Sequence, residues 1–190
     1  TIVELSNGKL LVGGDFTDYN GTSYNRIVRL NPDGSVDTSF NIGLGFNDNV
    51  LDIIVQNDSK ILIAGGFTSY NGETYNYLIR LNSDGSVDTT FNSGGGLPPG
   101  PFKMSLTLDN KIILVGSFTE YDGNPVNRIV KLNSDGTIDN TFNIGTGFDS
   151  IVYGLAISSD NKIYVSGYFS EYDGTSSNRL VSLYNDTVLS

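Results

Sequence analysis

Short apolar runs separated by polar turns follow one another along the whole chain, which is the pattern of β-strands. Four kinds of run recur in a fixed order. The first kind covers residues 2–5, 50–56, 103–107 and 151–158, and the second includes 9–16 and 60–67. The third kind first occurs at residues 25–31 and recurs in every set. The short fourth kind covers residues 36–40, 87–91 and 138–142. No segment has the period of a helix, so the sequence predicts an all-β protein.

The second run of each set is almost continuously apolar, as in residues 10–12, 61–64 and 112–115. A strand with one face in water alternates apolar and polar residues, whereas a strand covered on both faces does not. The sequence therefore predicts short sheets that are buried on both faces. Polar turns rich in Asn, Asp and Gly, which tolerate positive φ, join the first run of each set to the second.

The set of runs repeats with a constant step of 51 residues. Phe16 recurs as Phe67, Phe118 and Phe169, and the copies of Asn25 follow the same step without a gap. A unit that repeats in this way cannot bury its apolar faces alone and stacks on its neighbours. Four-stranded units of this length are typical of the blades of a β-propeller.

The predicted fold is therefore a β-propeller of four-stranded antiparallel blades, arranged as a single array over residues 1–190. The repeats cover approximately residues 1–49, 50–100, 101–150 and 151–190. A β-solenoid has shorter coils, and a sandwich would not keep one period across four units. The last repeat lacks its fourth strand, which we expect to come from further residues of a longer chain or from a second copy.

Composition narrows the classes of function. The net charge of −10 argues against binding to nucleic acid or to an anionic membrane surface, because both attract clustered Lys and Arg. No apolar run approaches the ~20 residues of a membrane helix, so we expect no membrane insertion. The chain has no Cys and no His, which removes thiolate chemistry, the commonest general base and the commonest transition-metal ligand. We expect a protein that is not an enzyme and holds no cofactor.

The stretch "KLLVGGDFTDYNGTSYNRIVRLNPDGSVDTSFNIGLGF", residues 9–46, resembles the delta-60 repeat. The resemblance covers the whole chain, although the fourth repeat lacks the Asp-Gly pair of the other three. It implies a β-propeller that lies in a bacterial extracellular or cell-surface protein or in a phage virion protein, with a role in binding or display. It implies no catalytic residues. The Gly-Gly pair is also similar to kelch repeats, but this chain has no Trp.

The loop that contains Asp33 and Asp37 offers the oxygen ligands that calcium takes. However, the loop has only two carboxylates and lacks the order of an EF-hand. We therefore interpret it as a turn in which the Asp side chains accept backbone hydrogen bonds and Gly34 takes a positive φ, with calcium as the alternative.

Pairs of carboxylates could also hydrolyse a glycosidic bond. The candidate pairs are Asp15 with Asp18, and Glu120 with Asp122. Because most acidic residues recur at equivalent places in every repeat, whereas an active site needs asymmetry, a carbohydrate-active hydrolase is a secondary hypothesis.

Departures from the repeat are the better candidates for a specific site. Tyr77 replaces an Arg that the other repeats share, Lys103 follows the atypical stretch 94–102, and the fourth repeat adds tyrosines that include Tyr164 and Tyr168. Exposed tyrosines near polar groups can hold a sugar. The alternative is that the last repeat only repacks its core with Tyr.

The sequence thus predicts a structural and recognition module of an extracellular, cell-surface or virion-surface protein that binds a protein or a surface glycan. A pure scaffold that assembles into a ring or a filament is the first alternative. Self-association and continuation into further repeats are both compatible with the pattern.

Overall fold

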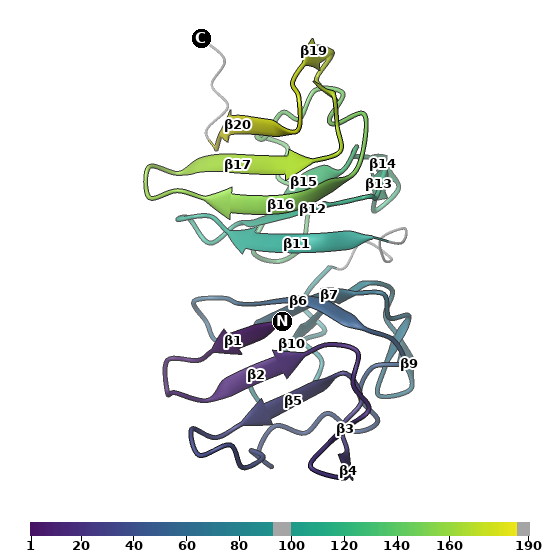
Figure 1. The fold of residues 1–190 in the computed structure, drawn as a ribbon, viewed down its shortest axis with the longest axis vertical. Coiled ribbons are helices and arrows are strands. Elements are labelled where there is room, and N and C mark those ends of the chain that lie inside the picture. Colours follow the sequence, from purple (N-terminus) through teal and green to yellow (C-terminus); the bar gives the residue numbers. More distant parts are fainter. Residues whose placement is uncertain (93–99, 186–190) are drawn as a thin grey trace. The chain divides into compact units, whose positions relative to one another are not determined.

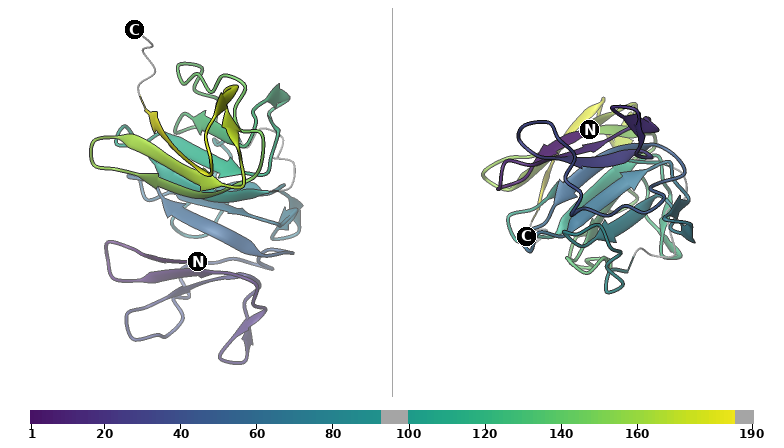
Figure 2. Two further views of the ribbon diagram at one scale, coloured as in Figure 1. Left: turned by 45° about the horizontal axis from the view of Figure 1, so that its top comes forward. Right: turned by 90° about the horizontal axis from the view of Figure 1, so that it is seen from below.

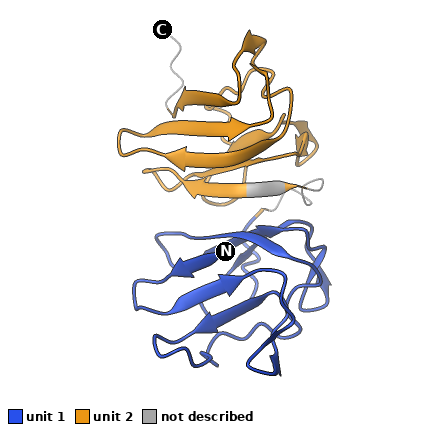
Figure 3. Ribbon diagram, in the orientation of Figure 1, with its two compact units in different colours: residues 1–91 blue, residues 92–190 orange. Residues whose placement is uncertain are grey.

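The computed structural model describes residues 1–92 and 100–185, and within these ranges the chain forms β-strands and turns without any helix (Figure 1). The structure divides into two compact units, Thr1–Phe91 and Asn92–Ser190 (Figure 3). Each unit contains two repeats and is described by itself.

The first unit consists of two three-stranded antiparallel sheets. One sheet has the order β1 (Ile2–Glu4), β2 (Leu10–Gly13) and β5 (Ile27–Leu30). The other has the order β6 (Val50–Val55), β7 (Ile61–Gly65) and β10 (Leu78–Leu81). The middle strand of each sheet is the almost continuously apolar run of the sequence.

The second unit repeats this arrangement (Figure 1). Its first sheet has the order β11 (Pro101–Leu106), β12 (Ile112–Gly116) and β15 (Ile129–Leu132). Its second sheet has the order β16 (Val152–Ile157), β17 (Lys162–Gly167) and β20 (Leu180–Tyr184). All pairings are antiparallel, as the sequence predicts.

Each repeat also carries a two-stranded hairpin that the sequence pattern did not separate from the turns. The four hairpins are β3–β4 (Asp18–Tyr19, Thr22–Ser23), β8–β9 (Ser69–Tyr70, Glu73–Thr74), β13–β14 (Glu120–Tyr121, Asn124–Pro125) and β18–β19 (Glu171–Tyr172, Thr175–Ser176). The two loop residues of each hairpin have positive φ, for example 50° at Asn20 and 76° at Gly21. Asn-Gly and Asp-Gly pairs favour such tight turns, which explains why they recur here.

In the first three repeats the fourth strand is shorter than predicted. It is reduced to single antiparallel bridges, Leu30 to Val36 and its copies Leu81 to Val87 and Leu132 to Ile138. The reason is the Asp that follows each bridge. Asp37 Oδ1 accepts hydrogen bonds from the backbone N–H and the hydroxyl of Ser39, which bends the chain out of the sheet. The corresponding positions of the fourth repeat lie outside the described residues.

The core of each unit lies between its two sheets. In the first unit, Leu11 and Ile27 pack against a cluster from the next repeat that includes Ile53, Ile61 and Ile63. In the second unit, the β11–β12–β15 sheet is stacked on the β16–β17–β20 sheet (Figure 2). An equivalent core of buried side chains joins these two sheets. Within each unit, the first sheet therefore uses one face, here called the front face, to pack on the rear face of the second sheet.

Recurring aromatic residues pack together at the contact between the two repeats of each unit. The ring centroid of Phe46 lies 4.4 Å from that of Phe67 and 4.6 Å from that of Tyr70. Phe148 makes the equivalent contacts with Phe169 and Tyr172 in the second unit. Such tilted aromatic pairs bury large apolar areas and stabilise the stacking of consecutive repeats.

A buried ion cluster connects the front face of one repeat to the next repeat. The Asp37 carboxylate pairs with Lys9 at 2.7 Å and with Arg29 at 2.6 Å, and the Arg29 guanidinium lies over the Phe40 ring. Arg29 also donates a hydrogen bond to the Ser83 carbonyl of the following repeat. In the second unit Lys131 takes the place of Arg29 and donates to the Asn185 carbonyl at 3.2 Å. The cation thus links two repeats while its charge is balanced within its own repeat.

We expect Gly45→Ala to destabilise the protein more than Gly21→Ala. Both glycines have positive φ, 72° and 76°, but a Cβ at Gly45 would lie 2.5 Å from the Asn25 carbonyl oxygen, whereas nothing lies within 4 Å of a Cβ at Gly21. Gly21→Ala should lose about 1 kcal/mol of unfolding free energy from the left-handed backbone alone. Gly45→Ala should lose roughly 2–4 kcal/mol, because the clash adds to that strain. Urea unfolding followed by tyrosine fluorescence measures both, and equal losses would contradict the argument.

Candidate functional site

Exposed large apolar side chains are concentrated in the fourth repeat. Of the eight such residues in the described part of the chain, five belong to this repeat, namely Tyr153, Tyr164, Tyr168, Leu180 and Tyr184. A concentration of this kind on one element is a common mark of an interaction site, whereas single exposed apolar residues are normal.

Three of these residues lie on the front face of the β16–β17–β20 sheet. Tyr164 pairs with Ser182, and the neighbouring pairs are Ser166 with Leu180 and Lys162 with Tyr184. Residues that are paired or two apart along a strand point to the same side, so Tyr164, Leu180 and Tyr184 share this face. The side chains between them, such as Ile163, point to the other side and are buried in the core of the unit.

The front face of the fourth repeat is equivalent to the faces that pack between repeats within each unit. Tyr164 corresponds to Leu11 and Ile113, which are completely buried, yet its side chain is 39% exposed. Leu180 corresponds to Ile27, which is also completely buried, and it is 64% exposed. Tyr164 and Leu180 therefore occupy stacking positions that nothing covers within the described residues.

A second aromatic group lies at the end of the same sheet. The rings of Tyr153 and Tyr168 meet edge to face, with centroids 5.3 Å apart, and the Arg179 guanidinium lies 5.6 Å from the Tyr168 centroid. These three residues are here called the tyrosine pair cluster. The Tyr168 ring is 64% exposed, so its surface is available to an apolar face of a ligand with a cation beside it.

The four residues predicted from the sequence do not come from one element. Tyr164 lies on the front face of β17, and Tyr168 belongs to the tyrosine pair cluster. Lys103 is exposed on β11 of the third repeat, where it pairs with Val115. Tyr77 belongs to the first unit and is half-buried just before β10. The atypical stretch 94–102 that precedes Lys103 falls largely on residues 93–99, which lie outside the described residues.

The backbone explains the exchange of Arg for Tyr at position 77. Tyr77 has a φ of 65°, and the arginines at the equivalent positions, Arg26, Arg128 and Arg179, have φ values of 64° to 70°. The Tyr77 N–H donates to the Phe67 carbonyl, as the Arg26 N–H does to the Phe16 carbonyl. The position is thus selected for its backbone geometry, and different side chains fit it.

Comparison with family models identifies the repeat. The model described as "Domain of unknown function (DUF5122) beta-propeller" matches four times, at residues 5–40, 56–91, 108–142 and 158–183, which together make up more than half of the chain. The chain belongs to the DUF5122 β-propeller family. No curated protein matches it. The propeller fold predicted from the 51-residue period is therefore correct. In every repeat the match begins after the first strand of the three-stranded sheet and covers the second strand and all or most of the third.

The loops of this DUF5122 propeller that contain Asp33 and its copies are turns, as the sequence predicts. Asp33 Oδ1 accepts hydrogen bonds from the Ser35 backbone N–H at 2.9 Å and from the Ser35 hydroxyl at 2.6 Å. The hydroxyl contact is the main cause that lowers the pKa of Asp33. Gly34 has a φ of 83°. The Asp33 carboxylate thus orders its own turn.

The second Asp of the loop has a different role. Asp37 and its copies Asp88 and Asp139 are buried in the ion clusters. Burial raises the pKa of Asp139, but hydrogen bonds from Lys111 and Thr141 outweigh this effect and lower the pKa to about 2. A carboxylate that stays ionised at neutral pH and is already paired is a poor general acid.

The remaining acidic candidates, Asp15, Asp18, Glu120 and Asp122, are all exposed. Asp15 pairs with Arg26 at 3.1 Å, and Glu120 and Asp122 lie on and next to the exposed hairpin strand β13. Within the described residues, no group of three or more His, Cys, Asp or Glu side chains could hold a metal ion. The same residues include no helix that is long and apolar enough to cross a membrane.

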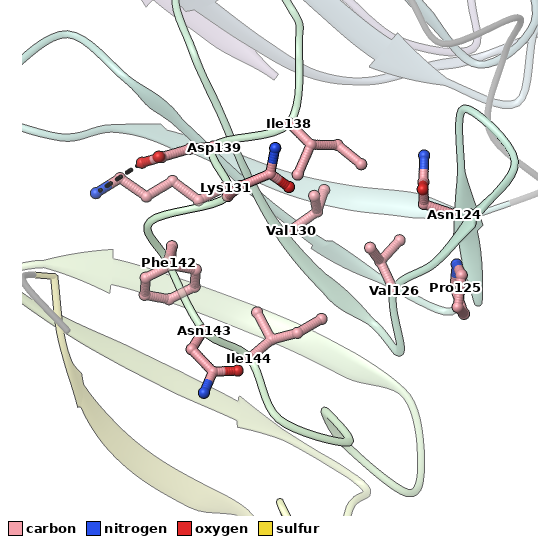
Figure 4. A pocket seen from close by; sticks show the side chains of 11 residues that line it. Asn124, Pro125, Val126, Val130, Lys131, Ile138, Asp139, Phe142, Asn143 and Ile144 are labelled. Carbon is pink, nitrogen blue, oxygen red and sulfur yellow. Dashed lines mark ion pairs between the residues drawn. The ribbon is translucent and has the colours of Figure 1, made fainter. Parts of the chain in front are cut away.

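A pocket of about 340 Å³ opens in the third repeat between β14 and the segment that follows Ile138 (Figure 4). Apolar side chains line it beside the Lys131–Asp139 ion pair. Val126 stands here where the first two repeats have the larger Tyr24 and Tyr75. The sequence analysis did not single out this pocket, although comparison of equivalent positions could have found it.

Acid should weaken the protein in part through Asp139. The folded pKa of about 2 lies below the unfolded value of 3.8, so this carboxylate stabilises the fold fully above about pH 4 and progressively less as the pH falls toward 2. The contribution is about 2 kcal/mol. Asp139→Asn should therefore be less stable at pH 7 and lose less stability than the wild type between pH 4 and 2, as measured by urea unfolding.

The matched control for this prediction is Asp122→Asn. Asn naturally stands at the equivalent positions 20 and 71, and residue 122 lies on an exposed hairpin. This variant should keep the wild-type dependence of stability on pH. If Asp139→Asn and the wild type lost the same free energy over this range, the ion cluster would not be the source of the acid sensitivity.

Proposed function

We propose that this DUF5122 propeller is a non-enzymatic recognition module that binds a partner through the tyrosine pair cluster of its fourth repeat. The observation that carries the proposal is the concentration of exposed tyrosines in one repeat out of four. Repeats that share a scaffold differ where function is specific, because the shared residues are already committed to packing and turns.

The chemistry of the cluster suits a glycan. The Tyr153–Tyr168 contact holds the Tyr168 ring in one orientation, so little conformational entropy is lost when a sugar ring stacks on it. The Arg179 guanidinium beside the ring supplies donors for hydroxyl or carboxylate groups. A surface glycan is therefore the partner that we favour, and a protein that presents an aromatic or acidic side chain is the second candidate.

The resemblance to the delta-60 repeat supports an exposed location for the module, in a bacterial extracellular or cell-surface protein or in a virion. The net charge of −10 and the absence of Cys are compatible with such a location. A carbohydrate-active hydrolase is less well supported, since the carboxylates of the ion clusters are paired, Asp15 pairs with Arg26, and the other acidic candidates are exposed to solvent.

Binding to a glycan panel and to intact bacterial cells tests the proposal. The labelled chain should bind saturably, and Tyr168→Ala should weaken binding by about 10-fold or more because the stacking surface is lost. Tyr168→Phe keeps the ring and should retain most of the affinity. Far-UV circular dichroism of each variant checks that the fold is intact.

Tyr77→Ala serves as the comparison in the first unit. It should leave the affinity unchanged if the site is the tyrosine pair cluster. Loss of binding in Tyr77→Ala alone would move the site to the first unit, and an absence of binding to every glycan and cell by a folded sample would refute recognition of these partners.

A further inference from the structure

The front face of the fourth repeat and the rear face of the first repeat differ from the equivalent faces of the other repeats. The differences on the two faces are complementary in side-chain size and in charge. The front face is defined by Tyr164, Leu180, Ser182 and Tyr184 and the rear face by Ile2, Glu4, Leu10 and Val12. We propose that these two faces bind each other between two copies of this chain, head to tail. This inference goes beyond the recognition function and uses residues outside the tyrosine pair cluster.

The faces that already pack inside each unit provide the template. Ile2, Leu10 and Val12 correspond to Ile53, Ile61 and Ile63, which are buried against the front face of the first repeat. In the first repeat the same positions are uncovered to different extents. Ile2 is 67% exposed, and Leu10 and Val12 are half-buried. The rear face thus keeps the apolar composition of a stacking surface.

Two differences in side-chain size indicate that the front face of the fourth repeat fits the rear face of the first repeat. Within the first unit, the long Arg29 of the front face and the short Val55 of the following rear face line the same pocket. On the front face of the fourth repeat and the rear face of the first repeat this size relation is reversed. Ser182 replaces the Arg, and Glu4 replaces the Val. A head-to-tail contact would therefore fill the space left by the shorter Ser182 with the longer Glu4.

The charges of the two faces are also complementary. Lys162 corresponds to Lys9, whose carboxylate partner Asp37 lies 28 positions further along, but the position 28 residues after Lys162 is a serine. Lys162 pairs instead with Asp160, whose side chain is 58% exposed. Lys162 lies diagonally across the strand pair from Ser182, within reach of a carboxylate placed there. Glu4 on the rear face of another copy supplies that carboxylate.

Such a contact joins different surfaces of the two copies. It forms a closed ring if the rotation between copies closes and an open chain of copies if it does not. In both cases the association depends on both faces of every copy. This distinguishes it from a symmetric contact, in which two front faces would pack on each other.

Sedimentation velocity of the 190-residue chain over a range of concentrations tests the proposal. The wild type should associate beyond the monomer, and Leu180→Asp and Ile2→Asp should each weaken association by about 10-fold or more, because each places a charge in an apolar contact. Leu108→Asp is the control, since Leu108 is 70% exposed but lies on neither face. A monomeric wild type at every concentration, or equal effects of all three variants, would overturn the proposal.

Mixing variants separates a head-to-tail contact from a symmetric one. Leu180→Asp keeps an intact rear face and Ile2→Asp an intact front face, so an equimolar mixture should form dimers of one copy of each. A mixture that forms no such dimers would refute the head-to-tail arrangement.

Exchange of the charges tests the predicted ion pair. Glu4→Lys and Lys162→Glu should each weaken association, and the chain that carries both changes should regain most of it. Association that stays lost in the double variant would contradict contact between these residues. Tyr168→Ala should leave association unchanged, so failure of the glycan proposal and failure of this one are distinguishable.

Discussion

A three-stranded sheet with apolar residues on both faces is unstable unless another layer covers each face, and this requirement governs the whole structure. Within each unit, one such contact covers the front face of the first sheet and the rear face of the second sheet. Because the contact recurs with the repeat, the energetics of the chain are those of a linear array in which each sheet depends on its neighbours.

The ion cluster makes the stacking specific as well as favourable. Arg29 is nearly buried, with its charge balanced by Asp37 and its remaining donor directed to the carbonyl of Ser83 in the following repeat. An apolar residue at this position would provide area without a fixed direction, whereas a buried cation requires its partners to lie at defined places. The register of one repeat on the next is thereby set by hydrogen bonds and by apolar packing together.

The fourth repeat departs from this pattern of apolar stacking and a buried ion cluster. It has Tyr164 at a stacking position, Ser182 in place of the buried cation, and the Tyr153–Tyr168 pair at the end of its sheet. A repeat scaffold offers equivalent surfaces many times, so a specific interaction needs at least one repeat that differs from the rest. Both proposals, recognition of a glycan and head-to-tail association, rest on these differences.

The amino-acid sequence by itself determined the repeat, the all-β fold, the propeller family and the role of Asp33 in its turn, because these depend on local pattern and on a period that needs no coordinates. Only the tertiary structure decided that the fourth strand shrinks to one bridge and that Asp37, Arg29 and Lys9 form one cluster. It also decided that Tyr164 lies on a stacking face whereas Tyr168 pairs with Tyr153. These facts depend on which side chains from distant positions meet, and the sequence pattern records the face of each residue but not its partner on the next sheet.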